Sequence, residues 1–150
     1  MCSIRRRRMK ITILEDSAVH RVRLETAIRK GMAELGVAAR ILATGKIMEF
    51  EASLGRDTSH HLYFLDLDIQ GERNKGFEVA QLIRRYNPHA IIVFMTDVPE
   101  VSPLAFQYHV SALDFIDKDG ADYDKRVKEC LEYTARQLRI IDQKGGSSLL

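Results

Sequence analysis

His61-Leu62-Tyr63-Phe64-Leu65-Asp66 is an apolar run that closes on an acidic residue. A short, continuous apolar segment of this kind is typical of a buried strand. The same pattern occurs at Ile11–Leu14, where the next two residues are Glu15 and Asp16. These two segments predict core strands that carry acids at their carboxyl ends.

Apolar runs and helical patterns alternate along the rest of the chain. We expect strands at residues 11–14, 37–42, 61–65, 90–95 and 112–116, and helices at residues 17–35, 46–54, 77–87, 101–108 and 123–140. The helix at 101–108 is the least regular, because Pro99 and Pro103 flank its start. This alternation predicts an α/β domain with a five-stranded parallel sheet and helices on both faces. The common order at this size is 2-1-3-4-5, which is flavodoxin-like (CheY-like).

The composition fits one packed domain rather than a disordered or membrane-spanning chain. Of the 150 residues, 45% are hydrophobic and 29% are charged, and apolar runs such as Ala90–Met95 are too short to cross a bilayer. The formal net charge is +2, and Arg5–Arg8 carry four positive charges, so residues 9–150 sum to −2. Direct DNA binding by this chain alone is therefore not expected. Cys2 and Cys130 form no metal motif, and we expect a reducing cytoplasm.

The chain divides into three parts. We expect residues 1–8 to be a disordered basic extension ahead of the true start at Met9, although a run of four arginines can also bind nucleic acid or an anionic membrane. Residues 9–140 are expected to form the folded domain. Residues 141–150, which include Gly145–Ser148, are expected to be a linker or tail.

Acidic, hydroxyl and basic residues follow four of the expected strands, and the set is Glu15, Asp16, Asp66, Asp68, Thr96 and Lys118. Since a parallel sheet places its functional crevice beyond the carboxyl ends of its strands, we expect these residues to converge. Converging carboxylates repel one another, and a bound Mg²⁺ removes that cost. The predicted metal ligands are Glu15, Asp16, Asp66 and the backbone carbonyl of Asp68.

Asp66 is placed to act as a carboxylate nucleophile that forms an aspartyl phosphate. Mg²⁺, the Lys118 ammonium and the Thr96 hydroxyl would stabilise the charge that develops on the phosphoryl oxygens. Taken singly, an acid after a strand is usually a helix cap, and a lone lysine is usually a surface charge. The agreement of four strand ends favours a functional site.

These residues resemble those of response-regulator receiver domains, with an acid pair after the first strand, Asp after the third, Thr after the fourth and Lys after the fifth. The resemblance covers about residues 9–140. The strings at residues 63–66, 75–80, 91–94 and 108–118 are similar to those of the AgrA/ComE group, and most similar to those of the competence regulator ComE. That group controls peptide quorum sensing, competence and bacteriocin production through a receiver joined to a LytTR-type DNA-binding domain.

The resemblance implies a cytoplasmic phosphoprotein that is not itself an enzyme and does not insert into membranes. A membrane sensor histidine kinase would phosphorylate Asp66, and Phe115, at the position of the family's switch aromatic, would turn inward as Thr96 moves toward the phosphate. A homodimer would form through the face of the fourth helix, fifth strand and fifth helix. The residues that precede the fifth strand either pack on that partner or are ordinary core and rim, and they are Phe106, Tyr108, His109 and Val110. The DNA-binding domain is expected to be absent, so that transcriptional control would need that missing part.

The sequence departs from the family pattern at three places. Asp119 replaces the proline that many receivers carry after the lysine, Glu15 replaces an aspartate, and residues 97–101 differ from the usual polar stretch. These departures leave the turn at Lys118 and the start of the fourth helix open.

Two other functions stay open. Leu65-Asp66-Leu67-Asp68 resembles the Asp-x-Asp motif of haloacid-dehalogenase-like phosphatases, in which the first Asp is the nucleophile and the second is a general acid. Against this, Ile69 stands where a hydroxyl residue is expected, and the motif lies in mid-chain. The other alternative is an interaction module that works without phosphorylation.

Overall fold

The computed structural model of the chain describes residues 8–54 and 62–138. The elements in these ranges are β1 (Arg8–Leu14), α1 (Ala18–Leu35), β2 (Ala38–Thr44), α2 (Ile47–Leu54), β3 (Leu62–Asp66), α3 (Lys75–Tyr86), β4 (Ile91–Thr96), the 3₁₀ helix η1 (Pro99–Phe106), β5 (Asp114–Asp117) and α4 (Tyr123–Gln137). All neighbouring strands pair in parallel, in the order β2-β1-β3-β4-β5. The predicted fold class is therefore confirmed.

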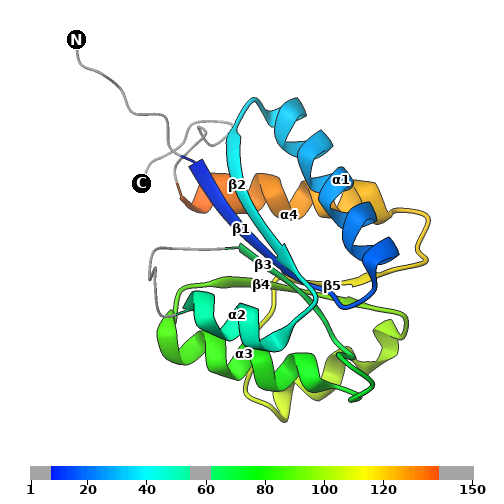
Figure 1. The fold of residues 1–150 in the computed structure, drawn as a ribbon. Coiled ribbons are helices and arrows are strands. Elements are labelled where there is room, and N and C mark those ends of the chain that lie inside the picture. Colours follow the sequence, from blue (N-terminus) through cyan, green and yellow to red (C-terminus); the bar gives the residue numbers. More distant parts are fainter. Residues whose placement is uncertain (1–7, 55–61, 139–150) are drawn as a thin grey trace.

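Helices cover both faces of the sheet, with α1 and α4 on one side and α2, α3 and η1 on the other (Figure 1). The side chains of β3 alternate between the two cores: Phe64 packs toward α1 and α4, and Leu65 packs toward α2 and α3. Because both faces are covered, β3 and β4 are largely apolar up to their last residues, as parallel strands in α/β proteins usually are. These two strands end on the polar residues Asp66 and Thr96.

Helix α1 begins directly beyond the acid pair that follows β1. The Ser17 hydroxyl accepts a hydrogen bond from the His20 amide at 3.3 Å, which caps the first turn. The helix ends at Gly36, whose φ of 69° is a left-handed conformation that glycine adopts without steric cost. Glu15 and Asp16 are thus fixed between the end of a buried strand and a capped helix.

The fourth helix is irregular, as the prolines at its start indicate, and it lies two residues earlier than expected. The prediction places a helix at residues 101–108, and the chain forms the 3₁₀ helix η1 at Pro99–Phe106. Pro103 lies inside it and has no N–H to donate, so a regular α-helical bond at that position cannot form. In the described residues, the five expected helices therefore correspond to four α-helices and one 3₁₀ helix.

Most other boundaries differ from the expected ones by a few residues. Strand β1 begins at Arg8, which was assigned to the basic extension, and α3 begins at Lys75 rather than Phe77. The rest of the expected extension and the expected tail at 141–150 lie outside the described residues. Among the helices that are described, none combines the length and the apolar character that crossing a bilayer requires.

Candidate phosphoryl-acceptor site

The carboxyl ends of β1, β3, β4 and β5 surround one pocket. The six residues that the sequence analysis predicts to converge all line this pocket, and they are Glu15, Asp16, Asp66, Asp68, Thr96 and Lys118. Ser17, His20 and Asp97 complete the lining. The convergence inferred from the strand ends is therefore present in the fold.

Three carboxylates meet in this pocket. Oxygen atoms of Glu15, Asp16 and Asp66 all lie within 4.8 Å of one another. Glu15 and Asp66 are buried, with 3% and 4% of their surface exposed, whereas Asp16 is exposed. Asp16 is held at the rim, where one of its oxygens accepts a hydrogen bond from the Gln70 amide at 2.8 Å.

Lys118 is the buried cation that bridges two of these acids. Its Nζ lies 2.8 Å from Oε1 of Glu15 and donates to Oδ1 of Asp66 at 3.0 Å. Lys118 has an exposed fraction of 6%. A buried ammonium shared between two buried carboxylates leaves the three groups with a net negative charge when all are ionised.

The pKa values of the site follow from this arrangement. Burial raises the pKa of Asp66 to about 8, with the negative charge of Glu15 acting in the same direction and the Lys118 ammonium opposing it. Burial would lower the pKa of Lys118, but the hydrogen bond to Glu15 and the charge of Asp66 outweigh it and raise that pKa. For Asp16, the Gln70 amide and the other hydrogen bonds outweigh the effect of burial, and its pKa is lowered.

The donor set fits a hard divalent cation. Three carboxylate oxygens within 4.8 Å form an all-oxygen cluster of the kind that Mg²⁺ prefers. The raised pKa of Asp66 shows that one carboxylate charge is poorly compensated by Lys118 alone. A second cation would therefore be accommodated at this cluster, with Glu15, Asp16 and Asp66 as its side-chain ligands.

Asp68 and Thr96 make local hydrogen bonds that shape the pocket wall. The Asp68 amide donates to Asp66 Oδ1 at 3.3 Å, and its carboxylate accepts from the Asn74 amide at 2.8 Å. The Thr96 hydroxyl is buried and accepts from the Val98 amide at 2.9 Å, so its own proton can still be donated to a ligand. The role of the Asp68 carbonyl as a metal ligand stays a prediction.

Phe115 does not line the pocket. It lies on β5, opposite Phe94 of β4, and the two rings stack with their centroids 5.0 Å apart. The ring of Phe77 is tilted against it at 6.3 Å. The side chain is thus half-buried and already packs on the core beneath α3 and η1 in this structure.

The residues expected near a dimer face are exposed only in part. Phe106 is 83% exposed and His109 is also exposed. Val110 is buried and Tyr108 is half-buried, with its ring stacked on Phe77 at 4.8 Å. Of the two alternatives for these residues, Val110 belongs to the core, and a partner surface stays a prediction for the exposed ones.

The chain is similar to curated regulators over most of its length. It is 30% identical to accessory gene regulator protein A of Staphylococcus epidermidis over 138 residues, which are 91% of this chain and 58% of that protein. The protein of the same name from Staphylococcus aureus is 32% identical over 137 residues, which are 90% of this chain and 57% of that protein. The chain thus spans less than two thirds of the length of these relatives. No family model matches it.

A solved structure has the same architecture. The response regulatory domain of MrkE from Klebsiella pneumoniae matches with a TM-score of 0.69 and 23% identity, over 87% of this chain and 98% of that chain. The fold is that of a response-regulator receiver domain. The sequence comparison and the structural comparison thus each match regulators over nearly the whole chain.

The site also contains contacts that the sequence did not reveal. Two arginines of α1 donate to carbonyls of the site: Arg21 to Glu15 at 2.8 Å and Arg23 to Lys118 at 2.6 Å. His20 lines the pocket with its Nδ1 4.0 Å from Oε1 of Glu15. Charged residues on a helix near an acid pair are too common to single out, because only the fold shows which of them turn toward the site.

Proposed function

We propose that this chain is a phospho-accepting receiver domain in which Asp66 takes a phosphoryl group from a histidine kinase. The observation that carries the proposal is the meeting of three carboxylates with the buried Lys118 ammonium at the ends of separate strands. A protein that shared only the receiver fold would not need these four groups together, because the fold can form without them. The similarity to accessory gene regulator proteins supports the same reading.

The proposed step is a phosphoryl transfer to a carboxylate. An oxygen of Asp66 attacks phosphorus, the bond to the donor nitrogen breaks, and the donor imidazole leaves. Lys118 and the Thr96 hydroxyl then bind phosphoryl oxygens. When bound by Glu15, Asp16, Asp66 and the Asp68 carbonyl, Mg²⁺ supplies further positive charge for those oxygens. The domain acts as an acceptor, and it returns phosphate by slow hydrolysis at most.

The phosphatase alternative has less support. It requires Asp68 to act as a general acid beside Asp66. The Asp68 carboxylate is instead engaged by the Asn74 amide at 2.8 Å, in the turn that precedes α3. We therefore assign the site to accepting a phosphoryl group rather than to turnover.

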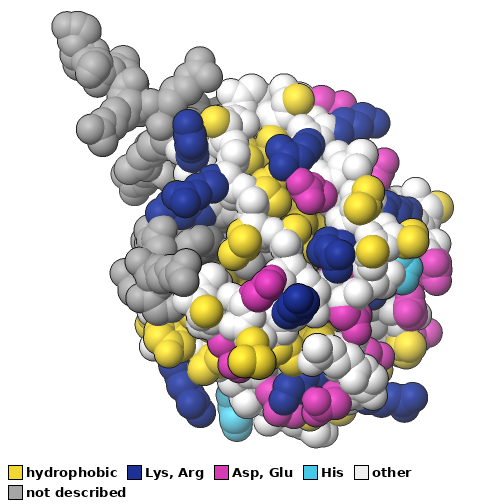
Figure 2. Space-filling view, viewed as in Figure 1, with side chains coloured by type: hydrophobic (Ala, Val, Ile, Leu, Met, Phe, Trp, Pro, Cys, Tyr) yellow, Lys and Arg dark blue, Asp and Glu magenta, His cyan; other side chains and the backbone are white. Residues whose placement is uncertain are grey.

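The wider setting is proposed from the resemblance of the sequence motifs to the AgrA/ComE group. We place the domain in the cytoplasm, downstream of a membrane sensor kinase that responds to a secreted peptide, in quorum sensing of the competence or bacteriocin type. In the complete regulator, a LytTR-type domain would bind DNA. On the face shown in Figure 2, Lys and Arg side chains are interspersed with Asp and Glu, which fits a receiver that relies on another domain for DNA contact.

Dimerisation is the proposed output. Phosphorylation would favour the packed position of Phe115 and the arrangement of η1, β5 and α4 that pairs with a second copy. Phe106 on η1 and Tyr133 on α4 are exposed aromatic side chains on these elements, at 83% and 43%. Aromatic residues of this kind often anchor protein interfaces.

The central test is labelling of the 150-residue chain by acetyl phosphate with Mg²⁺, read as a mass increase. The parent and Asp124→Asn, an exposed acid on α4, should be labelled at the same rate. Asp66→Asn should not be labelled. Labelling of Asp66→Asn at the parental rate would refute the assignment, and multiple-turnover release of phosphate from a generic ester would favour the phosphatase.

A further inference from the structure

Lys118 is restrained through its main chain as well as through its ammonium. Its amide donates to the Thr96 carbonyl at 2.9 Å. Its carbonyl accepts a hydrogen bond from Nη1 of Arg23 at 2.6 Å, although Arg23 precedes it by 95 positions in the chain. The residue is thus held from β4 on one side and from α1 on the other.

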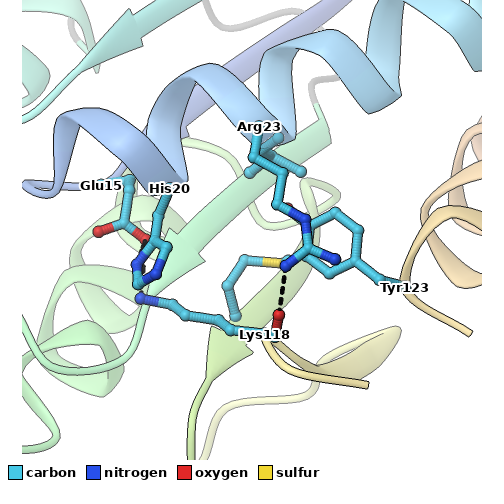
Figure 3. Close-up of a pocket in the computed structure, with 7 residues that line it drawn as sticks. Glu15, His20, Arg23, Lys118 and Tyr123 are labelled. Carbon is cyan, nitrogen blue, oxygen red and sulfur yellow. Dashed lines mark hydrogen bonds and ion pairs between the residues drawn. The ribbon is translucent and has the colours of Figure 1, made fainter. Parts of the chain in front are cut away.

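Arg23 is itself held in place by an aromatic ring. Its guanidinium carbon lies 3.9 Å from the ring centroid of Tyr123, the first residue of α4. Tyr123 is buried, so the ring is a fixed platform, and a cation stacked on it is attracted by the face of the ring. Figure 3 shows Arg23 reaching from α1 past the Tyr123 ring to the Lys118 carbonyl.

The turn at Lys118 needs restraint from outside. The next residues, Asp119 and Gly120, do not fix φ as a proline would. The bonds within the turn, from the amides of Asp119 and Gly120, both end on Asp117, at 2.9 and 3.0 Å. They do not hold the Lys118 carbonyl, which takes its hydrogen bond from Arg23.

The side chain of Lys118 also faces a small cavity. A small cavity lies between α1, β4 and the start of α4, and Lys118, Arg23, Leu24 and Met95 are among its lining residues (Figure 3). Atoms that face a void have no dispersion partners there. The position of the ammonium therefore depends on the position of the Lys118 main chain and on the carboxylates of Glu15 and Asp66 that the ammonium contacts.

We propose that Arg23, stacked on Tyr123, is a positioning residue that fixes the Lys118 main chain so that the ammonium reaches a phosphoryl group on Asp66. The inference rests on the proposed function of the site. Arg23 does not touch the phosphoryl group in this account, and it acts through Lys118. Its loss leaves the lysine present but lets its carbonyl and the turn shift.

The test uses beryllofluoride, which mimics a phosphoryl group on a carboxylate, with the 150-residue chain at fixed Mg²⁺. The apparent Kd is followed by fluorine NMR. Arg23→Met keeps the length of the side chain and removes the donors, and we expect binding to weaken about three- to tenfold. Arg29→Met is the matched control, because Arg29 lies on the same helix and pairs with Glu25 on the surface. It should bind as the parent does.

A double-mutant cycle separates positioning from general damage. In the Lys118→Met background, Arg23→Met should weaken binding by less than about twofold, since its effect passes through the missing ammonium. Equal losses in both backgrounds, or parental binding by Arg23→Met, would overturn the proposal. If Arg23→Met does not fold, Arg23→Lys takes its place, because it keeps the charge and one nitrogen donor. Its binding of beryllofluoride should be about two- to threefold weaker than that of the parent. Binding as tight as that of the parent would count against the proposal. A parent that does not bind beryllofluoride would instead refute the proposed function.

Discussion

Gly76, the second residue of α3, offers a sharp test of how the helix supports the end of β3, where Asp66 lies. A Cβ placed there would lie 2.5 Å from the Asp66 carbonyl oxygen and 2.9 Å from the Leu67 Cα, and both atoms are backbone. To reach an ordinary contact of 3.4 Å, the helix and the strand end must separate by about 0.9 Å. The Gly76 amide also donates to the Leu67 carbonyl at 2.8 Å, so this separation strains a hydrogen bond.

Gly76→Ala should therefore destabilise the domain and misplace Asp66. Overpacking against atoms that cannot rotate away costs about 1–3 kcal/mol, which corresponds to a melting temperature lower by roughly 3–12 °C for a domain of this size. A shift approaching 1 Å at the nucleophile should slow labelling by acetyl phosphate by about ten- to a hundredfold. Urea unfolding gives the free energy of unfolding, and the mass increase with time gives the labelling rate.

The matched control is Gly31→Ala. Gly31 is also buried in a helix, but a Cβ there would meet the Leu131 Cδ1 at 2.7 Å, the far end of a side chain that can rotate. The higher helix propensity of alanine, about 1 kcal/mol, offsets that adjustment, so stability and labelling should stay near the parental values. A Gly76→Ala protein with parental stability and labelling would refute the argument that the Gly76 contact sets the position of Asp66.

Three further outcomes are expected. The pKa of Asp66 is raised to about 8 in the fold, so the folded state keeps a proton that the unfolded chain releases near pH 4. Without Mg²⁺, the free energy of unfolding should therefore fall by on the order of 2–4 kcal/mol as pH rises from about 4 to 8. Urea unfolding should show this slope in the parent and a smaller one in Asp66→Asn, and Mg²⁺ should stabilise the parent more at pH 8 than at pH 5. Lys118→Met leaves Glu15 and Asp66 buried without their cation, so the free energy of unfolding should drop by about 3–5 kcal/mol without Mg²⁺. Addition of Mg²⁺ should restore part of this loss, and no recovery would argue against a cation site. Phe106→Ser should leave the melting temperature within about 2 °C of the parent and abolish dimers that form with beryllofluoride and Mg²⁺, as measured by sedimentation.

The sheet and the acid cluster could be predicted because they follow from rules that act along the chain. Apolar runs indicate the strands, and Glu15 directly after β1 and Asp66 at the end of β3 lie at the same edge of a parallel sheet. The irregularity of η1 could be predicted from Pro99 and Pro103, because a proline inside a helical pattern removes a donor. The 3₁₀ form itself could not, because a missing donor shows where a regular helix fails and not which conformation replaces it.

Other features could not be read from the sequence, because they depend on which side chains the fold brings together. Val110 follows an exposed histidine and yet is buried, since the chain turns at His109, where φ is 56°, and directs Val110 into the core. Arg23 and Tyr123 lie 100 positions apart, and only the packing of α1 beside α4 makes them neighbours. No periodicity within one element encodes such a contact.

The coupling between the site and the proposed dimer face spans only two neighbouring strands. Thr96 and Phe94 are two residues apart on β4, so their side chains point to the same face of the sheet. Phe94 is paired with Phe115 on β5, and their rings are stacked. A movement of Thr96 toward a phosphoryl group would change the space available beside these rings. The backbone of β5 need not move, because its pairing with β4 and the Thr96–Lys118 hydrogen bond hold it in register. In the proposed switch, side chains would move on a fixed frame, and the proposed restraint of Lys118 by Arg23 would keep the ammonium in place while Thr96 moves.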